Sequence, residues 1–368
     1  MSKNIVICCD GTGNEFRGDG NSNVVKLYST LIINQAQVGY YHPGVGTMGD
    51  PSARTWMGKQ WSRAKGLAFG AGFLANVADA YRYLMDAYAD GDRVFLFGFS
   101  RGSYTARSLA GVLHMYGLLC PGNQGLIPYI IQMFARKTRE AAGLTETLQT
   151  ADNFKAAFSR DCPMHFEGLW DTVSSVGWIF SPLVLPFSAR NPSMREGRHA
   201  ISIHERRCYY RQNLWGAPFK DQNIKQVWFT GVHSDIGGSY PESQSGLSKV
   251  TLEWMLHEAA EAGLIIDRSK AAVVLGKAAR PEPWMPQYVA PDGNAQMHDS
   301  LRGFWWILEY LPHRYVDFRS GSPVVRWRIP RGARRQIPTG STIYEFAKPF
   351  VPAWDESFKT EPAVTFPL

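Results

Sequence analysis

The fold of this 368-residue chain is decided by one stretch, Val94-Phe95-Leu96-Phe97-Gly98-Phe99-Ser100-Arg101-Gly102-Ser103-Tyr104-Thr105-Ala106-Arg107. Its first four residues are apolar and rich in aromatics, which is typical of a strand buried on both faces of a sheet. The pattern Gly-x-Ser-x-Gly follows at once at residues 98–102, and the residues after it can begin a helix. Strand, tight turn and helix are the context that a nucleophile elbow requires. The stretch therefore predicts a serine nucleophile, Ser100, at the end of a buried strand.

The two glycines of this motif have a mechanical role. A serine on so sharp a turn takes strained backbone angles, and a side chain at Gly98 or Gly102 would collide with the neighbouring strand and helix. The turn lifts the Ser100 hydroxyl above the sheet, and the helix N-terminus behind it favours negative charge. The alternative interpretation is a serine in an ordinary glycine turn.

Strand and helix patterns alternate along most of the chain. Strands are predicted at residues 5–9, 38–42, 164–170 and 226–232. Helices are predicted at residues 24–32, 74–88, 104–116 and 248–262, and residues 124–158 are mostly helical. Such alternation predicts an α/β fold with a mostly parallel sheet flanked by helices. We expect one domain over residues 1–368, with a lid or insertion around 174–222 and an irregular C-terminal part at 281–368.

The composition and charge of the chain limit the kinds of binding partner that we expect. Apolar residues make up 45% of the chain and the mean hydropathy is −0.23, as in a globular protein with an ample core. The net charge of +7 is moderate, and basic residues cluster only locally, as at Arg331–Arg335. We therefore expect no nucleic-acid partner, whereas an anionic lipid surface and an acidic partner suit this charge equally well.

The cysteines and the N-terminus indicate where the chain is made. Five cysteines, an odd number without metal-type spacing, indicate reduced core thiols of a cytosolic protein and no bound metal or cofactor. They are Cys8, Cys9, Cys120, Cys162 and Cys208. The first residues run straight into a strand, so we expect no signal peptide. The predicted location is the cytoplasm at synthesis, with export only by a route that needs no cleaved leader.

A serine nucleophile needs a base and a carboxylate that orients the base. Two pairs follow Ser100 in the order Ser, Asp, His. Asp235 follows a predicted strand and His298 lies in the loop 293–300, where a catalytic histidine can be presented. Asp171 also follows a predicted strand, and His233 lies directly at a strand end, which is less usual. We favour Asp235 and His298, and the pair Asp171 and His233 remains open. Two other downstream histidines are expected to be structural or surface residues: His257 and His313.

The segment Asp10-Gly11-Thr12-Gly13 also follows a predicted strand. The backbone N–H groups of Gly11, Thr12 and Arg101 are candidates for an oxyanion hole. The Asp-Gly-Thr triplet is also found in phosphatases of the haloacid-dehalogenase type. That chemistry needs an aspartate nucleophile two residues earlier, where this chain has Cys8, so the phosphatase interpretation fails.

Six motifs, taken in order, resemble one family, the α/β-hydrolase family that includes the type VI secretion phospholipase effectors. They are residues Ile7–Asn14, Gly98–Gly102, Gly168–Val173, His199–Arg207, Val227–Gly238 and His298–Ser300. The match extends over about residues 3–350. The resemblance implies an α/β-hydrolase fold and a triad, carried onto Ser100, Asp235 and His298. It also implies hydrolysis of phospholipid acyl esters, as by a phospholipase A, and delivery as an antibacterial effector with an immunity or secretion-apparatus partner.

The chain departs from the family pattern at His204, where an aspartate is expected, and in its length, because the effectors often add a membrane-binding module. The apolar loop from Trp178 to Phe187 independently suggests lipid, although a buried lid or packing loop fits it equally. The side chain of Arg101 is placed to meet an anionic headgroup, or else points to solvent or pairs with an acid. We expect a serine esterase or lipase acting on phospholipids. The alternatives are an esterase for soluble substrates and a non-catalytic interaction domain.

Overall fold

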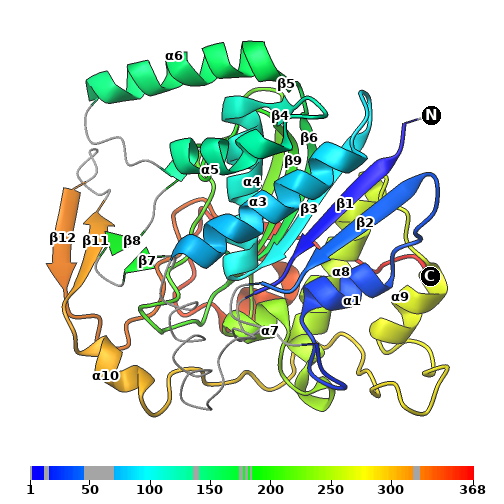
Figure 1. Ribbon diagram of the computed structural model, residues 1–368. Coiled ribbons are helices and arrows are strands. Elements are labelled where there is room, and N and C mark those ends of the chain that lie inside the picture. Colours follow the sequence, from blue (N-terminus) through cyan, green and yellow to red (C-terminus); the bar gives the residue numbers. More distant parts are fainter. Residues whose placement is uncertain are drawn as a thin grey trace, which may run out of the picture.

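An eight-stranded sheet forms the centre of the computed structural model, which describes residues 2–11, 16–44, 70–135, 141–173, 177–178, 181–182, 185–317 and 324–368 (Figure 1). The strand order is β14-β13-β10-β9-β6-β3-β1-β2, and every pair of neighbours is parallel. The predicted α/β fold with a mostly parallel sheet and flanking helices is confirmed.

The elements have the following bounds. The sheet strands are β1 Asn4–Cys9, β2 Gln37–His42, β3 Arg93–Phe99, β6 Met164–Trp170, β9 Met194–Ser202, β10 Asn223–Phe229, β13 Thr342–Tyr344 and β14 Lys359–Glu361. Three antiparallel pairs are β4 Leu118–Leu119 with β5 Ser159–Arg160, β7 Gly177–Trp178 with β8 Ser181–Pro182, and β11 His313–Asp317 with β12 Val324–Arg328. The α-helices are α1 Asn23–Ser29, α3 Gly70–Ala87, α4 Arg101–Tyr116, α5 Ile127–Ala135, α6 Ala141–Phe158, α7 His233–Gly237, α8 Gly246–Glu261, α9 Arg268–Val274 and α10 Trp305–Glu309. The 3-10 helices are η1 Gln124–Leu126, η2 Glu242–Gln244 and η3 Glu345–Phe350.

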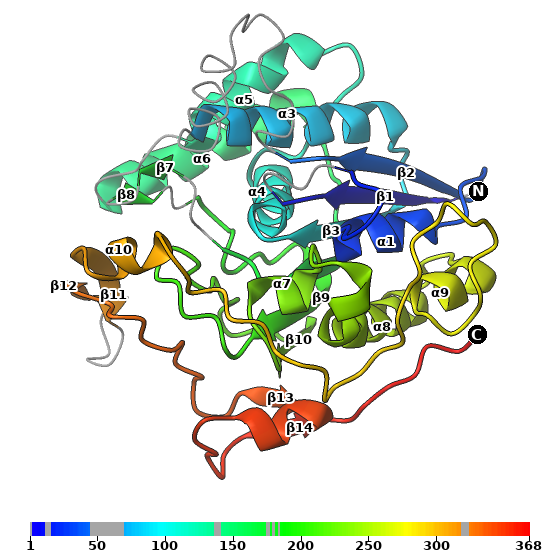
Figure 2. The same cartoon turned by 90° about the horizontal axis from the view of Figure 1, so that it is seen from below.

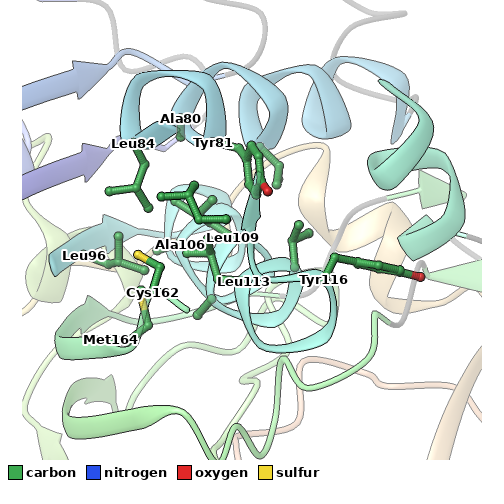
Figure 3. Packing of buried hydrophobic residues seen from close by; sticks show 14 of the residues in the cluster. Ala80, Tyr81, Leu84, Leu96, Ala106, Leu109, Leu113, Tyr116, Cys162 and Met164 are labelled. Atoms are coloured by element: carbon green, nitrogen blue, oxygen red, sulfur yellow. The ribbon is translucent and has the colours of Figure 1, made fainter. Parts of the chain in front are cut away.

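Helices cover both faces of the sheet. Successive side chains of a strand point to opposite faces, so they belong to two different cores. Ile5 and Ile7 of β1 belong to one core, with α3 and α4, whereas Val6 and Cys8 belong to the other, with α1 and α8. Figure 2 shows α3 on one side of β1 and β2 and α1 on the other. In the first core, Leu96 of β3 packs among side chains of α3 and α4 (Figure 3). This two-sided burial explains why β1 and β3 are almost entirely apolar.

The strand order reverses between β1 and β3. After β1 the chain adds β2 on one side, then returns to place β3 on the other and continues outward from there. In open parallel sheets such a reversal creates a crevice at the carboxyl ends of the strands, where ligands bind. The segment after β1 begins with Asp10, and Ser100 follows β3, so both candidate motifs lie at the carboxyl ends of the two strands that flank this reversal.

Strands that the sequence analysis did not predict complete the sheet. Residues 194–202, inside the predicted lid or insertion at 174–222, form β9 between β6 and β10. The β9 pattern is obscured by buried polar residues, among them Arg198, which is ion-paired with Glu258. The C-terminal part predicted to be irregular contributes β13 and β14, which are three residues each and too short to show alternation.

Candidate active site

Ser100 occupies the predicted strained turn. It lies between β3 and α4 with φ 59° and ψ −124°, a region that residues other than glycine rarely adopt. A Cβ on Gly98 would come within 2.6 Å of Cα of Ser103 in α4, and a Cβ on Gly102 would overlap the carbonyl oxygen of Cys9 in β1. The predicted collisions with the adjacent helix and strand are therefore confirmed.

The Ser100 hydroxyl contacts His233, the first residue of α7. The distance from Ser100 Oγ to His233 Nε2 is 2.8 Å, and His233 Nδ1 lies 2.5 Å from Oδ2 of Asp171. All three side chains are buried. Because the carboxylate only accepts, His233 donates from Nδ1 and its Nε2 accepts from the serine hydroxyl, which is the arrangement of a general base.

Aromatic rings enclose the imidazole of His233. The ring of Phe99 stacks on it at 4.7 Å between centroids, and Tyr210 meets it edge-on at the same distance. Burial lowers the pKa of His233 below its ordinary value, although the hydrogen bond to Asp171 acts in the opposite direction. The imidazole is therefore kept neutral and ready to accept a proton at neutral pH.

Arg335 binds the carboxylate of Asp171 on its other side. Its Nη1 lies 2.5 Å from Oδ1 and its Nη2 lies 3.0 Å from Oδ2, and the backbone N–H of Ser202 donates to Oδ1 at 3.0 Å. Burial alone would raise the pKa of Asp171, but the Arg335 guanidinium and His233 outweigh it and hold the pKa well below its usual range. Asp171 is thus a permanently charged anchor for His233.

The contact of Arg335 with Asp171 was not predicted from the sequence. Arg335 appeared only as part of the basic cluster Arg331–Arg335, and its side chain is 5% exposed in the structure. Arg335 lies 164 positions from Asp171 along the chain. No sequence signal that we used links two residues so far apart.

Glu205 forms a second buried anion beside His233. Its carboxylate accepts two bonds from Arg207 at 2.9 Å, bonds from Ser300 Oγ at 3.0 Å, and the backbone N–H of His233 at 3.2 Å. Burial opposes its charge, yet the bonds from Arg207 lower the pKa of Glu205 to about 2. Two motifs, 199–207 and 298–300, thereby meet at the backbone that carries the histidine.

The preferred partners Asp235 and His298 do contact each other, but not Ser100. His298 Nδ1 lies 2.6 Å from Oδ1 of Asp235, while its Nε2 lies 3.0 Å from Oε1 of Gln244 and its ring stacks on Tyr240. The contacts of Ser100 therefore favour the open alternative, Asp171 and His233, over the pair that the sequence analysis preferred.

The geometry of α7 explains this outcome. His233 and Asp235 are the first and third residues of α7, so their side chains point about 200° apart around its axis. Asp235 turns back to accept the N–H of Val232 at 3.0 Å, which caps the helix. Only His233 faces the elbow.

The predicted oxyanion donors differ in their positions. Arg101 is the first residue of α4, directly after the nucleophile. The N–H of Gly11 donates at 2.6 Å to Oδ1 of the preceding Asp10, so in this structure it is already engaged. Thr12 lies outside the described residues. The Arg101 side chain is half-buried beside Tyr209 and Tyr210, and burial lowers the pKa of its guanidinium.

The remaining histidines and the apolar loop have structural surroundings. His204 accepts the N–H of Gly231 at its Nδ1, and its Nε2 lies 2.9 Å from the carbonyl oxygen of Phe350. His313 contacts the carbonyl oxygen of Leu308 at 3.1 Å, and His257 lies in α8. Much of the loop from Trp178 to Phe187 lies outside the described residues, and its residue Leu185 is buried.

Two features of metal-binding and membrane-spanning proteins do not occur in the described part of the chain. No cluster of three or more His, Cys, Asp or Glu side chains is arranged to hold a metal ion. No helix there combines the length and apolarity needed to cross a bilayer.

Known proteins resemble this chain over parts of their own length. The uncharacterised protein YEL023C of Saccharomyces cerevisiae is 34% identical over 221 residues, which are 57% of this chain and 32% of the yeast protein. An uncharacterised protein from Pseudomonas aeruginosa aligns in structure with a TM-score of 0.40 and 18% identity, over 72% of this chain and 47% of that one. The Tle1 effector bound to the VgrG spike of the type 6 secretion system aligns with a TM-score of 0.39 and 18% identity, over 67% and 52%. The chain thus spans about a third of the yeast relative and about half of each solved chain.

A family model confirms the resemblance that the six motifs carried. The model is described as the catalytic domain of the Tle1-like phospholipase effectors of type VI secretion, and it matches residues 3–258. The chain belongs to the family of Tle1-like phospholipase effector catalytic domains.

Proposed function

We propose that this protein is a serine hydrolase that cleaves acyl esters of phospholipids, with Ser100 as nucleophile, His233 as general base and Asp171 as the carboxylate that orients it. The observation that carries the proposal is the continuous chain of contacts from Ser100 Oγ to His233 Nε2 at 2.8 Å and from His233 Nδ1 to Asp171 at 2.5 Å. The family supports lipid as the substrate class.

The reaction follows from these positions. His233 takes the proton of the Ser100 hydroxyl as the oxygen attacks the ester carbonyl, and a tetrahedral oxyanion forms. The N–H of Arg101 and the N-terminus of α4 stabilise that negative charge. Collapse expels the lysolipid alcohol, which takes the proton from His233, and leaves an acyl-enzyme on Ser100. Water, deprotonated by His233, then releases the fatty acid and restores the serine.

Arg335 acts in this scheme as a positioning residue. Its planar fork holds both carboxylate oxygens of Asp171, which fixes the direction of the acceptor that His233 Nδ1 faces. Because Arg335 lies beyond residue 258, where the family match ends, the active site needs part of the chain outside that match.

The test is product analysis on mixed phospholipids, combined with covalent labelling. We expect free fatty acid and lysophospholipid from the wild type and neither from Ser100→Ala. A fluorophosphonate probe should label the wild type at Ser100. An enzyme that hydrolyses only soluble short-chain esters would sink the lipid assignment and keep the triad. A wild type that does not label and releases nothing would sink both and favour an interaction domain.

Delivery and partners follow from the family alone. The solved Tle1 effector is bound to a VgrG spike, and we propose that a spike protein also carries this chain, which would require no cleaved leader. Co-purification with the spike protein encoded in the same genome tests this proposal. If the two proteins did not co-purify, the delivery proposal would fail and the hydrolase assignment would be unaffected.

A further inference from the structure

Exposed apolar side chains gather on α10 and the β11–β12 hairpin. In the part of the chain that the structure describes, seven of the eighteen exposed large apolar side chains lie between residues 304 and 329. They are Phe304, Trp306, Ile307, Tyr310, Leu311, Trp327 and Ile329. Phe304 is 69% exposed and Ile307 is 58% exposed. Single exposed apolar residues are common on protein surfaces, whereas a group of them marks an interaction site. We call these seven side chains the apolar face.

The orientation of α10 is fixed by its polar residue. Glu309 is fully buried, and its carboxylate accepts the N–H of Cys208 at 2.6 Å and of Gly332 at 3.1 Å. The N–H of Arg331 donates at 2.9 Å to the carbonyl oxygen of Glu309. A surface helix ordinarily buries its apolar residues and exposes its charges. Here the arrangement is inverted, and the bonds to Glu309 keep Ile307 and its neighbours pointing to solvent.

The same segment has an excess of positive charge. Residues 301–335 contain eight arginines and two acidic residues, a formal charge of +6 out of +7 for the whole protein. Among the described side chains, four of these arginines are exposed: Arg302, Arg328, Arg331 and Arg334. Arg335 is buried in an ion pair with Asp171 and adds no charge to the surface. Of the two acids, Glu309 is buried. A surface that is both apolar and cationic matches an anionic lipid headgroup layer above acyl chains.

The apolar face adjoins the active site. Trp305 of α10 packs on Tyr210 with 5.5 Å between ring centroids, and Tyr210 packs on His233 at 4.7 Å. Figures 1 and 2 both show α10 beside the β11–β12 hairpin, at the end of the molecule away from α9. Contact of this end with a bilayer would bring the lipid surface next to the nucleophile.

We infer that the apolar face, with its flanking arginines, is the surface by which this protein docks on an anionic phospholipid bilayer. The inference rests on the proposed function and locates its interface with the substrate. Tryptophan and tyrosine favour the boundary between headgroups and acyl chains, and arginine favours anionic headgroups. We therefore expect the apolar face to bind a membrane rather than another protein.

Vesicle cosedimentation tests the apolar part in a Ser100→Ala background, so that no lipid is consumed. We expect the double variant Phe304→Glu with Ile307→Glu to partition at least about tenfold less onto phosphatidylglycerol vesicles. The matched control is Trp284→Glu, a residue that is 78% exposed and lies outside the apolar face, and it should bind as the parent does. Equal binding of the parent and the double variant, or equal loss in the control, overturns the inference.

Two arginines test the charged part. The double variant Arg331→Gln with Arg334→Gln should bind phosphatidylglycerol roughly twenty-fivefold less, at about fivefold for each charge, and its binding should depend less on salt. Lys270→Gln in α9 is the control, and binding of the parent to phosphatidylcholine should be weak. Retention of all binding in the arginine variant overturns the inference, as does a parent that binds a secretion spike through this face but no vesicle.

Hydrolysis by the enzymes with Ser100 intact separates this inference from the proposed function. The variant Phe304→Glu with Ile307→Glu should cleave a soluble short-chain ester within about twofold of the wild type and phosphatidylglycerol vesicles at least tenfold more slowly. A wild type without ester activity contradicts the proposed function, whereas equal loss on both substrates contradicts only the docking surface.

Discussion

The molecule contains two carboxylate–histidine pairs that are almost alike in their central contact. His233 lies 2.5 Å from Asp171, and His298 lies 2.6 Å from Asp235. They differ in what surrounds that contact. The His233 side chain is 5% exposed and its Nε2 faces Ser100, whereas the His298 side chain is 21% exposed and its Nε2 faces Gln244.

The carboxylates differ as well. Asp171 is neutralised by the guanidinium of Arg335, while Asp235 accepts the backbone N–H groups of Val232 and His298. One carboxylate therefore holds the histidine that contacts Ser100, and the other joins the loop 293–300 to α7. A pair of Asp and His becomes catalytic through what the second ring nitrogen meets, so residue types in the right order do not identify it.

Replacement of the two histidines should give the greatest difference in kcat. His233→Ala should lower kcat about 10⁴-fold or more, because the serine loses its base, whereas His298→Ala should lower it less than about tenfold. Steady-state hydrolysis of a soluble acyl ester measures both. If the two variants exchanged these values, Asp235 and His298 would be the true partners of Ser100.

Replacement of Arg335 tests the countercharge that only the first pair has. Arg335→Met should lower kcat/KM roughly ten- to a hundredfold, because Asp171 loses its fixed orientation. The uncompensated Asp171 charge should also stabilise the protonated His233, so the acid limb of the pH profile should move to higher pH.

Arg335→Lys is the matched control, because it keeps the charge and loses the planar fork. Its acid limb should stay near that of the wild type while its rate falls. A merely structural role for Arg335 would lower the rate in both variants and leave both pH profiles in place.

The pH dependence of the wild type gives a smaller, directional effect. Burial lowers the pKa of His233, so the imidazole becomes protonated, and inactive as a base, only below its ordinary value of about 6.5. The value of kcat/KM should therefore stay near its maximum at pH 6.5 and fall only at more acid pH. An acid limb above pH 7 would contradict the assignment of His233 as the base.

The smallest effect concerns the stability that the second pair supplies. Asp235→Ala should lower the free energy of unfolding by about 1–2 kcal/mol, because α7 loses the cap on Val232 and the bond to His298. Asp267→Ala removes an exposed cap from α9 and should cost about 1 kcal/mol or less. Urea unfolding of both variants compares the two caps. An unchanged free energy of unfolding in Asp235→Ala would refute the stabilising role of Asp235.

Local sequence patterns predicted most of the central fold. The apolar runs of β1 and β3 predict strands because strands buried on both faces leave continuous apolar stretches. The pattern did not reveal β9, where buried Arg198 and His199 interrupt it, or the three-residue strands β13 and β14. Those strands owe their place to neighbours in the sheet rather than to their own composition.

The strained turn that carries the proposed nucleophile could be predicted from a short motif. Ser100, Gly98 and Gly102 act through backbone angles and close contacts within a few residues, and such local sterics can be read from a short motif. The contact of His233 with Ser100, and that of Arg335 with Asp171 164 positions away, are set by the tertiary structure and cannot be read from such a motif. Side-chain direction on a short helix and the return of a distant segment depend on packing of the whole sheet, which no local pattern encodes.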